Sequence, residues 1–88
     1  MRYRYIPSGV CIGEIAFDID QDAIVTNITF LGGCDGNLKV LSKILSGKTV
    51  AEIIRIGRHN TCDGKPTSCM DQFAIAVEKA AKELNIIY

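Results

Sequence analysis

Residues 12–30 read IGEIAFDIDQDAIVTNITF and contain two apolar–polar alternations joined by a short polar connection. Every second side chain from Ile15 to Ile19 is apolar, which is the period of a half-buried strand. Residues 20–23 have the composition of a turn. The stretch therefore predicts a β-hairpin, and residues 3–6 are a candidate third strand ahead of it. The second alternation predicts a core face formed by Ile24, Ile28 and Phe30.

Two short helices are predicted after the hairpin. The first covers about residues 38–46, and Gly47 is its natural C-terminal residue. Thr49 and Glu52 have the spacing of a capping box, which opens a second helix that ends at Gly57. The inward side chains of the first helix are expected to be Leu38, Leu41, Ile44 and Leu45.

A third and longer helix is predicted at the C-terminal end. Thr67 or Ser68 is its expected N-cap, because hydroxyl side chains accept hydrogen bonds from the first free amides of a helix. Its buried stripe is expected to be Phe73, Val77, Ala80, Ala81 and Leu84. Strands followed by helices favour an α+β fold, with a small antiparallel sheet of two to three strands and three helices packed on one face. With 88 residues, we expect a single domain over residues 1–88.

Composition narrows the classes of function. Ten basic and ten acidic residues give zero formal net charge, whereas nucleic-acid-binding proteins usually carry a basic excess. The local basic cluster of Arg55, Arg58, His59 and Lys65 is most simply a solvated loop. The N-terminus lacks the apolar stretch of an export signal, and no apolar run is long enough for a membrane span. We therefore expect a cytoplasmic protein without a membrane or nucleic-acid partner.

The four cysteines are Cys11, Cys34, Cys62 and Cys69. Each is expected at a break in the secondary structure, whereas inert buried cysteines more often lie on the apolar face of an element. Cys34 and Cys69 precede or begin predicted helices, where the helix dipole lowers the pKa of a thiol. Structural disulfides would need an oxidising compartment. Metal ligation, redox chemistry and inert burial remain open, and we favour the first two.

A metal site in this chain would have to be assembled by the tertiary structure, because the sequence contains no C-x-x-C pair. Three or four thiolates suit tetrahedral zinc or an iron–sulfur cluster. The predicted ligands are Cys11, Cys34, Cys62 and Cys69, with Asp35, His59 and Asp71 as candidate auxiliary residues.

Several segments of the chain resemble the TSCPD domain family, which is named for a Thr-Ser-Cys-Pro-Asp motif. The matching segments are Gly9-Val10-Cys11, residues 30–38 (FLGGCDGNL), Leu45-Ser46-Gly47 and residues 67–72 (TSCMDQ), with Met70 in place of the motif's proline. This family occurs as short proteins and as a C-terminal domain of adenosylcobalamin-dependent ribonucleotide reductases. The resemblance implies an accessory module in deoxynucleotide synthesis, with a ribonucleotide reductase or a thiol-redox protein as partner.

A weaker similarity, to U-type iron–sulfur scaffold proteins, covers the same span. It rests on Cys11, Gly33-Cys34, the connection at residues 47–52, and Cys69 at the start of the last helix. It implies that Cys11, Cys34 and Cys69 would hold zinc or a nascent cluster, with Cys62 as a fourth ligand or a resolving thiol. It also implies a small antiparallel sheet backed by helices.

Three functions follow as alternatives: a zinc-binding accessory module, an iron–sulfur scaffold or carrier, and a thiol–disulfide relay that supplies electrons to a reductase. We expect no enzyme activity from this chain alone. Ribonucleotide reductase activity would be assigned to this chain only through its association with the adenosylcobalamin-dependent reductases.

Overall fold

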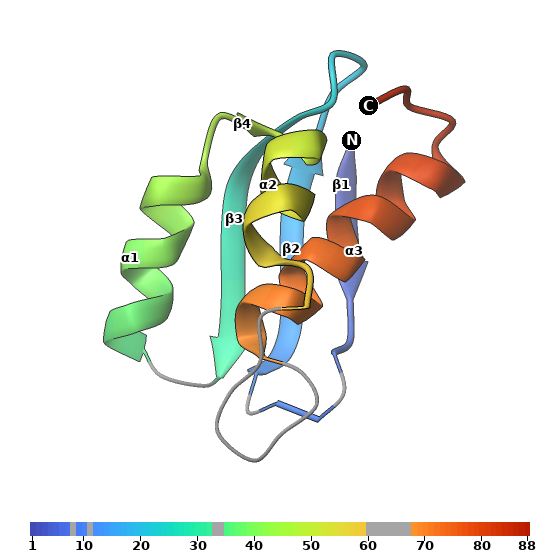
Figure 1. The fold of residues 1–88 in the computed structure, drawn as a ribbon. Coiled ribbons are helices and arrows are strands. Elements are labelled where there is room, and N and C mark those ends of the chain that lie inside the picture. The colour runs from blue at the N-terminus through green and yellow to red at the C-terminus, as the bar shows by residue number, and fades with distance from the viewer. Residues whose placement is uncertain (8, 11, 33–34, 60–67) are drawn as a thin grey trace.

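The computed structural model describes residues 1–7, 9–10, 12–32, 35–59 and 68–88, with the backbone alone described at 35–37. The elements in chain order are β1 (Arg2–Tyr5), β2 (Ile12–Ile19), β3 (Ile24–Gly32), α1 (Asp35–Leu45), β4 (Lys48–Thr49), α2 (Val50–Gly57) and α3 (Cys69–Glu83). Figure 1 shows the resulting arrangement of one sheet and three helices. The predicted α+β class is therefore confirmed.

The described strands form one antiparallel sheet in the order β1-β2-β3-β4. The hairpin β2–β3 and the candidate strand β1 are confirmed. The expected count of two to three strands was too low, because β4 pairs Lys48 and Thr49 with Val25 and Ile24. Two residues are too few to show an alternation, so this pairing leaves no periodic signal in the sequence.

A bulge in β3 changes which of its side chains face the core. Asn27 has a positive φ of 50°, and the β2–β3 register shifts between Ala16 and Asp18. An extra residue in one strand reverses the alternation beyond it. Val25 is consequently fully buried on the same side as Ile28, whereas the predicted core residue Ile24 is only half-buried.

The caps of the second and third helices form as the sequence predicts. Glu52 N donates to Thr49 Oγ1 and Thr49 N donates to Glu52 Oε1, both at 3.2 Å, which completes the capping box of α2. These bonds from Thr49 hold the pKa of Glu52 below its ordinary value. Ser68 is the N-cap of α3. The other predicted N-cap, Thr67, lies outside the described residues.

The helices are not placed equivalently around the sheet. In Figure 1, α2 and α3 lie in front of it, whereas α1 runs beside β3. Leu38 and Leu45 of α1 still belong to the common core. Ile44, however, is 57% exposed, so its predicted inward orientation is wrong. The helix begins three residues earlier than expected, and its inward stripe is narrower than predicted, with Leu41 packed against the core beside Leu38 and Leu45.

Aromatic rings join the sheet to α3 at the centre of the core. Phe73 of α3 meets Phe17 at 5.8 Å and Phe30 at 5.6 Å between ring centroids, both edge to face. Edge-to-face pairs add about 1 kcal/mol each beyond the apolar area that they bury. The predicted stripe of α3 is confirmed for Phe73, Val77, Ala80 and Ala81, which are fully buried.

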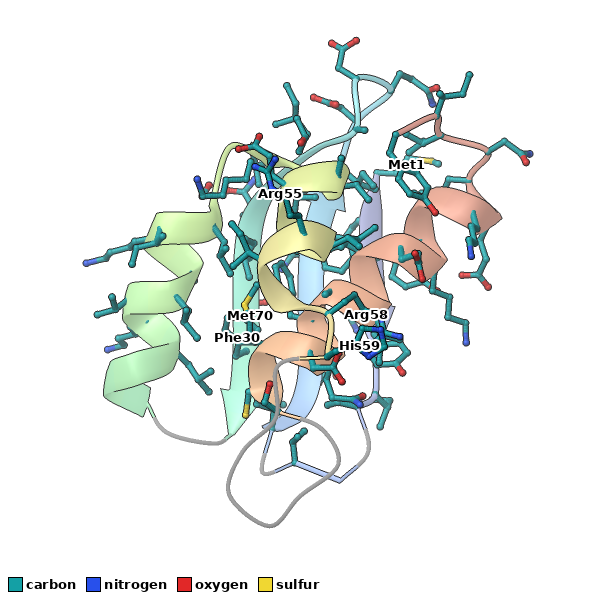
Figure 2. The ribbon with its side chains drawn as sticks, in the orientation of Figure 1. Met1, Phe30, Arg55, Arg58, His59 and Met70 are labelled. Atoms are coloured by element: carbon teal, nitrogen blue, oxygen red, sulfur yellow. The ribbon has the colours of Figure 1, made fainter. Side chains whose placement is uncertain are left out.

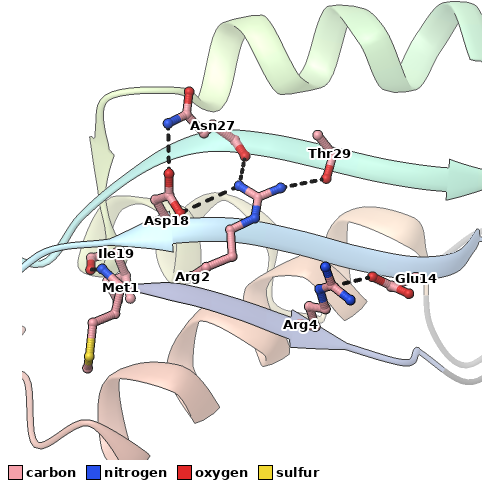
Figure 3. Close-up of polar contacts among 8 residues, drawn as sticks. All are labelled: Met1, Arg2, Arg4, Glu14, Asp18, Ile19, Asn27 and Thr29. Atoms are coloured by element: carbon pink, nitrogen blue, oxygen red, sulfur yellow. Dashed lines mark hydrogen bonds and ion pairs between the residues drawn. The ribbon is translucent and has the colours of Figure 1, made fainter.

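The sheet face away from α2 and α3 carries a polar network (Figure 3). Arg2 Nη1 donates to Asn27 O at 2.6 Å, and Arg2 Nη2 donates to Thr29 Oγ1 at 3.1 Å. Asn27 Nδ2 donates to Asp18 Oδ2 at 2.7 Å. This bond and the nearby Arg2 guanidinium hold the pKa of Asp18 below its ordinary value. The network links the first three strands across their solvent face.

Among the described residues, no helix has the length and apolar character that crossing a membrane requires.

Candidate functional site

Five chain segments meet at one end of the molecule. β2 begins there, β3 ends there, α1 and α3 begin there, and α2 ends there (Figure 1). Ile12, which follows Cys11 in the sequence, lies opposite Gly32 in the β2–β3 register. Asp35, the first residue of α1, directly follows Cys34. The fold therefore gathers the described neighbours of two predicted ligands at the end where α3 begins.

Cys69 is the first residue of α3 and is half-buried against the core. The preceding Ser68 is extended, and its Oγ accepts a hydrogen bond from Asp71 N at 3.1 Å. The thiol thus belongs to the first turn of a 15-residue helix, where unpaired amides and the positive end of the dipole favour an anion. This is the placement that the sequence predicts for a reactive thiolate or a ligand.

Asp71 joins this turn to the end of α2. Asp71 is only 4% exposed. Its Oδ1 accepts hydrogen bonds from Arg58 Nη1 at 2.6 Å and from His59 N at 2.8 Å. Asp71 was a candidate auxiliary ligand, and in the structure this carboxylate oxygen holds the residues that follow α2. Figure 2 shows Arg58 and His59 beside the first turns of α3.

The Arg58–Asp71 ion pair was missed by the sequence reasoning, which assigned Arg58 to a solvated basic loop. The Arg58 side chain is 29% exposed and that of Asp71 is 6% exposed. That interpretation was therefore wrong for Arg58. The usable signal was the acidic residue three positions after Ser68, because an aspartate in the first helical turn often accepts bonds from nearby donors.

His59 is exposed and has a positive φ of 66°. Its backbone amide, and not its ring, makes the contact with Asp71. The helix end of α2 thus presents the imidazole on the same side of the molecule as the start of α3 (Figure 2). Its role as an auxiliary ligand stays a prediction.

Gly57 and Met70 hold the two helices close together. A Cβ placed on Gly57 would lie 2.9 Å from both Cε and the carbonyl oxygen of Met70. Met70 is itself buried. Met70 replaces the proline of the TSCPD motif, and its side chain fills the space above this glycine. The substitution therefore exchanges a residue that favours helix initiation for one that packs α3 against α2.

The remaining predicted ligands lie outside what the structure describes. Cys11, Cys34 and Cys62 are not among the described residues, and neither is the side chain of Asp35. Within residues 1–7, 9–10, 12–32, 35–59 and 68–88, no group of three or more His, Cys, Asp or Glu residues has the arrangement of a metal site.

The described residues offer one soft donor atom at this end of the molecule, the sulfur of Cys69. Cys69 lies at a helix N-terminus, a position that in general favours the thiolate form, and thiolates are the ligands that zinc and iron–sulfur clusters take. The carboxylate nearest to it in the sequence, Asp71, is paired with Arg58, so part of its charge is neutralised.

Comparison with known proteins assigns the chain to one family. Neither the curated proteins nor the solved structures contain a match. A family model described as TSCPD domain, in contrast, matches residues 1–81 of the 88-residue chain. The match includes all four cysteines and the helix start at Ser68-Cys69, and the chain belongs to the TSCPD domain family.

Proposed function

We propose that this protein is a small accessory module that binds a metal through Cys11, Cys34, Cys62 and Cys69. The observation that carries the proposal is the meeting of chain segments around the start of α3. Ile12 and Gly32 are register partners, and Asp35 begins a helix at the same end. Each of these residues is one or two positions from a cysteine.

The core supports a short path from these strand ends to Cys69. Phe73 follows Cys69 by about one helical turn, which is roughly 6 Å along the axis. Its ring contacts Phe30 at 5.6 Å, and Phe30 lies two residues before Gly32. These contacts link the end of β3 to the first turns of α3 through packed side chains.

The chemistry favours zinc as the first assignment. Four thiolates complete a closed tetrahedral site, which is the usual form of structural zinc. Such a metal would link segments that are far apart in the sequence and would add folding free energy. The alternative, an iron–sulfur scaffold or carrier that uses Cys11, Cys34 and Cys69, needs the same thiols and differs in the metal that they hold.

Thiol–disulfide relay is a second candidate, favoured by the position of Cys69. A thiolate at a helix N-terminus is a good nucleophile toward a disulfide. In that function, two cysteines would form a disulfide and pass two electrons and two protons to an oxidised partner protein. Metal content and thiol reactivity separate this function from the first.

The decisive experiment is elemental analysis of protein purified anaerobically without an affinity tag, together with a thiol count before and after denaturation. We expect about one zinc per chain, with about four thiols protected until the protein unfolds. A few iron atoms and visible absorption would assign the cluster alternative. Four thiols that react freely without metal would contradict both metal functions and support the relay.

Variants at Cys69 test whether the metal is held by this thiol. Cys69→Ala removes the sulfur and keeps an apolar side chain, whereas Cys69→Ser keeps the shape of the side chain. Comparing the two variants separates the loss of a ligand from a packing defect. We expect both variants to lose the metal. Retention of a full equivalent by either folded variant would remove Cys69 from the ligand set.

The link to deoxynucleotide synthesis is the part of the proposal that rests on family membership. It is tested by mixing the metal-loaded protein with an adenosylcobalamin-dependent ribonucleotide reductase from the same cell. Co-elution or increased turnover is expected. Absence of both would contradict the partner and leave the metal site untouched.

A further inference from the structure

A cavity of about 200 Å3 lies between β3 and α1. Its lining consists of Ile28, Thr29, Phe30, Leu38, Lys39 and Ser42. None of these residues belongs to the candidate thiolate site. At about 30 Å3 for each water molecule, the volume is on the order of six waters, which is enough for a small organic molecule.

The topology explains why a cavity forms here. β4 covers β3 only at Ile24 and Val25, as far as the described residues show. Beyond Val25, α1 takes the place of a neighbouring strand along this edge (Figure 1). A cylindrical helix beside a flat strand leaves space where the helix carries a small side chain. Ser42, whose Oγ donates back to Lys39 O at 2.8 Å, is such a side chain.

The lining divides into an apolar part and a polar part. Ile28 is 7% exposed and Leu38 is 5% exposed, and both belong to the core. Together with the half-buried ring of Phe30, they form an apolar wall. Apolar walls with a few placed polar groups are typical of small-molecule sites.

The polar part carries positive charge. Lys39 lines the cavity directly. Arg2 reaches it through Thr29, whose Oγ1 accepts a hydrogen bond from Arg2 Nη2 at 3.1 Å (Figure 3). Arg2 also lies 3.6 Å from Asp18, so its charge is partly balanced. Among the described lining residues, Lys39 is the one that carries a charge, and this charge is positive.

We propose that this cavity binds a small organic anion with a short apolar tail. The tail would contact Ile28, Phe30 and Leu38. The anionic group, a carboxylate or a phosphate monoester, would lie between Lys39 and the hydroxyl group of Thr29. This site is independent of the proposed metal function, and loss of metal would leave it unchanged.

The test uses the full chain and NMR of its isoleucine and leucine methyl groups. Pentanoate, the neutral isostere pentanamide and pentyl phosphate are each titrated to about 50 mM, a range that covers the weak affinity of so small a ligand. We expect saturable shifts at Ile28 and Leu38 with the anions and weaker binding of the amide. The tighter of the two anions identifies the headgroup.

Two variants and a control make the outcome decisive. Lys39→Gln should weaken binding of the anions about threefold to fivefold and leave the amide unchanged. Ser42→Leu should fill the cavity and abolish the shifts for all three probes. Lys43→Gln, a matched change on α1 outside the lining, should have no effect. The proposal would be overturned by shifts that do not saturate or by equal affinity for the amide and the anions. An affinity for the anions that Lys39→Gln leaves unchanged would also overturn it.

Discussion

Arg58 and Asp71 differ in what the loss of their partner would cost. Asp71 is buried, so little water could take the place of the Arg58 guanidinium beside its carboxylate. Arg58 is partly exposed, so its guanidinium could turn toward solvent. Leaving a buried charge without its partner costs far more than a surface ion pair contributes. The pair therefore stabilises the junction of α2 and α3 mainly by satisfying Asp71.

We predict that Arg58→Met lowers the free energy of unfolding by about 2 kcal/mol, because it removes the guanidinium that is hydrogen-bonded to the buried Asp71 carboxylate. The partial exposure of Arg58 keeps the loss below that of a fully buried pair. Urea unfolding measures it. Arg55→Met, on an exposed residue in the last turn of the same helix, is the control and should stay within about 0.5 kcal/mol. Equal losses in the two variants would show that the pair contributes nothing specific.

Tyr3 makes stability depend on alkaline pH. Burial, and then the hydrogen bond that Tyr3 Oη donates to Glu83 Oε2, raises its pKa to about 12. A raised pKa in the folded state means that folding favours the protonated phenol. This contribution is complete below the unfolded pKa of about 10 and is lost as the pH rises toward the folded value.

We predict that wild-type protein loses stability between pH 10 and about 12 through this group. Tyr3→Phe should remove that part of the pH dependence, because it has no phenol to ionise. The quantity to measure is the difference in unfolding free energy between wild type and variant as a function of pH. It should fall as the pH rises. Tyr88→Phe, at the exposed C-terminal end, controls for general alkaline effects, and a difference independent of pH would refute the assignment.

At the scale of elements, Gly57 sets the distance between α2 and α3. Helix propensity alone would favour alanine over glycine by about 1 kcal/mol. A Cβ added at this position would lie 2.9 Å from two atoms of Met70, which opposes alanine. One of these atoms is a backbone carbonyl oxygen, which cannot rotate away. Packing therefore decides the residue at this position against local propensity.

We predict that Gly57→Ala destabilises the protein by about 1 to 3 kcal/mol, since the added methyl group must push the helices apart. Thermal or urea unfolding would show it. The double variant Gly57→Ala/Met70→Ala, compared with Met70→Ala alone, should remain destabilised, because the carbonyl contact persists. A neutral or stabilising Gly57→Ala would mean that propensity outweighs the contact.

For the whole molecule, the core and the candidate metal site are separate sources of stability. The buried core contains Phe17, Phe73 and aliphatic side chains from all three helices and the main strands, and Cys69 only borders it. A domain with such a core should fold without metal, unlike small zinc fingers that depend on it. A metal bound at the end of the molecule where these segments meet would then stabilise a structure that is already folded.

We predict that a chelator lowers the melting temperature of the metal-loaded protein by about 10 °C or more and leaves it folded. The size follows from several kcal/mol of metal binding spread over a domain of this length. Calorimetry measures the change in melting temperature, and far-ultraviolet circular dichroism shows whether the protein stays folded. A variant with all four cysteines changed to alanine should show no response to the chelator. Complete unfolding on chelation, or no shift at all, would contradict this division.

The elements that could be predicted from the sequence are those that depend on near neighbours. The hairpin in residues 12–30, the Thr49–Glu52 capping box and the Ser68 N-cap follow from local patterns and form as predicted, although the bulge in β3 changes which side chains of that strand face the core. The same local reasoning placed Cys69 at the start of α3, where the structure has it. The roles of Cys11, Cys34 and Cys62 stay predictions, because they lie outside the described residues.

Tertiary structure alone decided the features that depend on distant partners. β4 exists because Lys48 and Thr49 reach β3, and Asn27 adopts a bulge that brings Val25 into the core. The Arg58 guanidinium is partly buried because it pairs with a buried carboxylate 13 residues away in the sequence. Periodicity and capping report interactions within a few residues, whereas strand pairing, ion pairs and cavities depend on where the chain returns after folding.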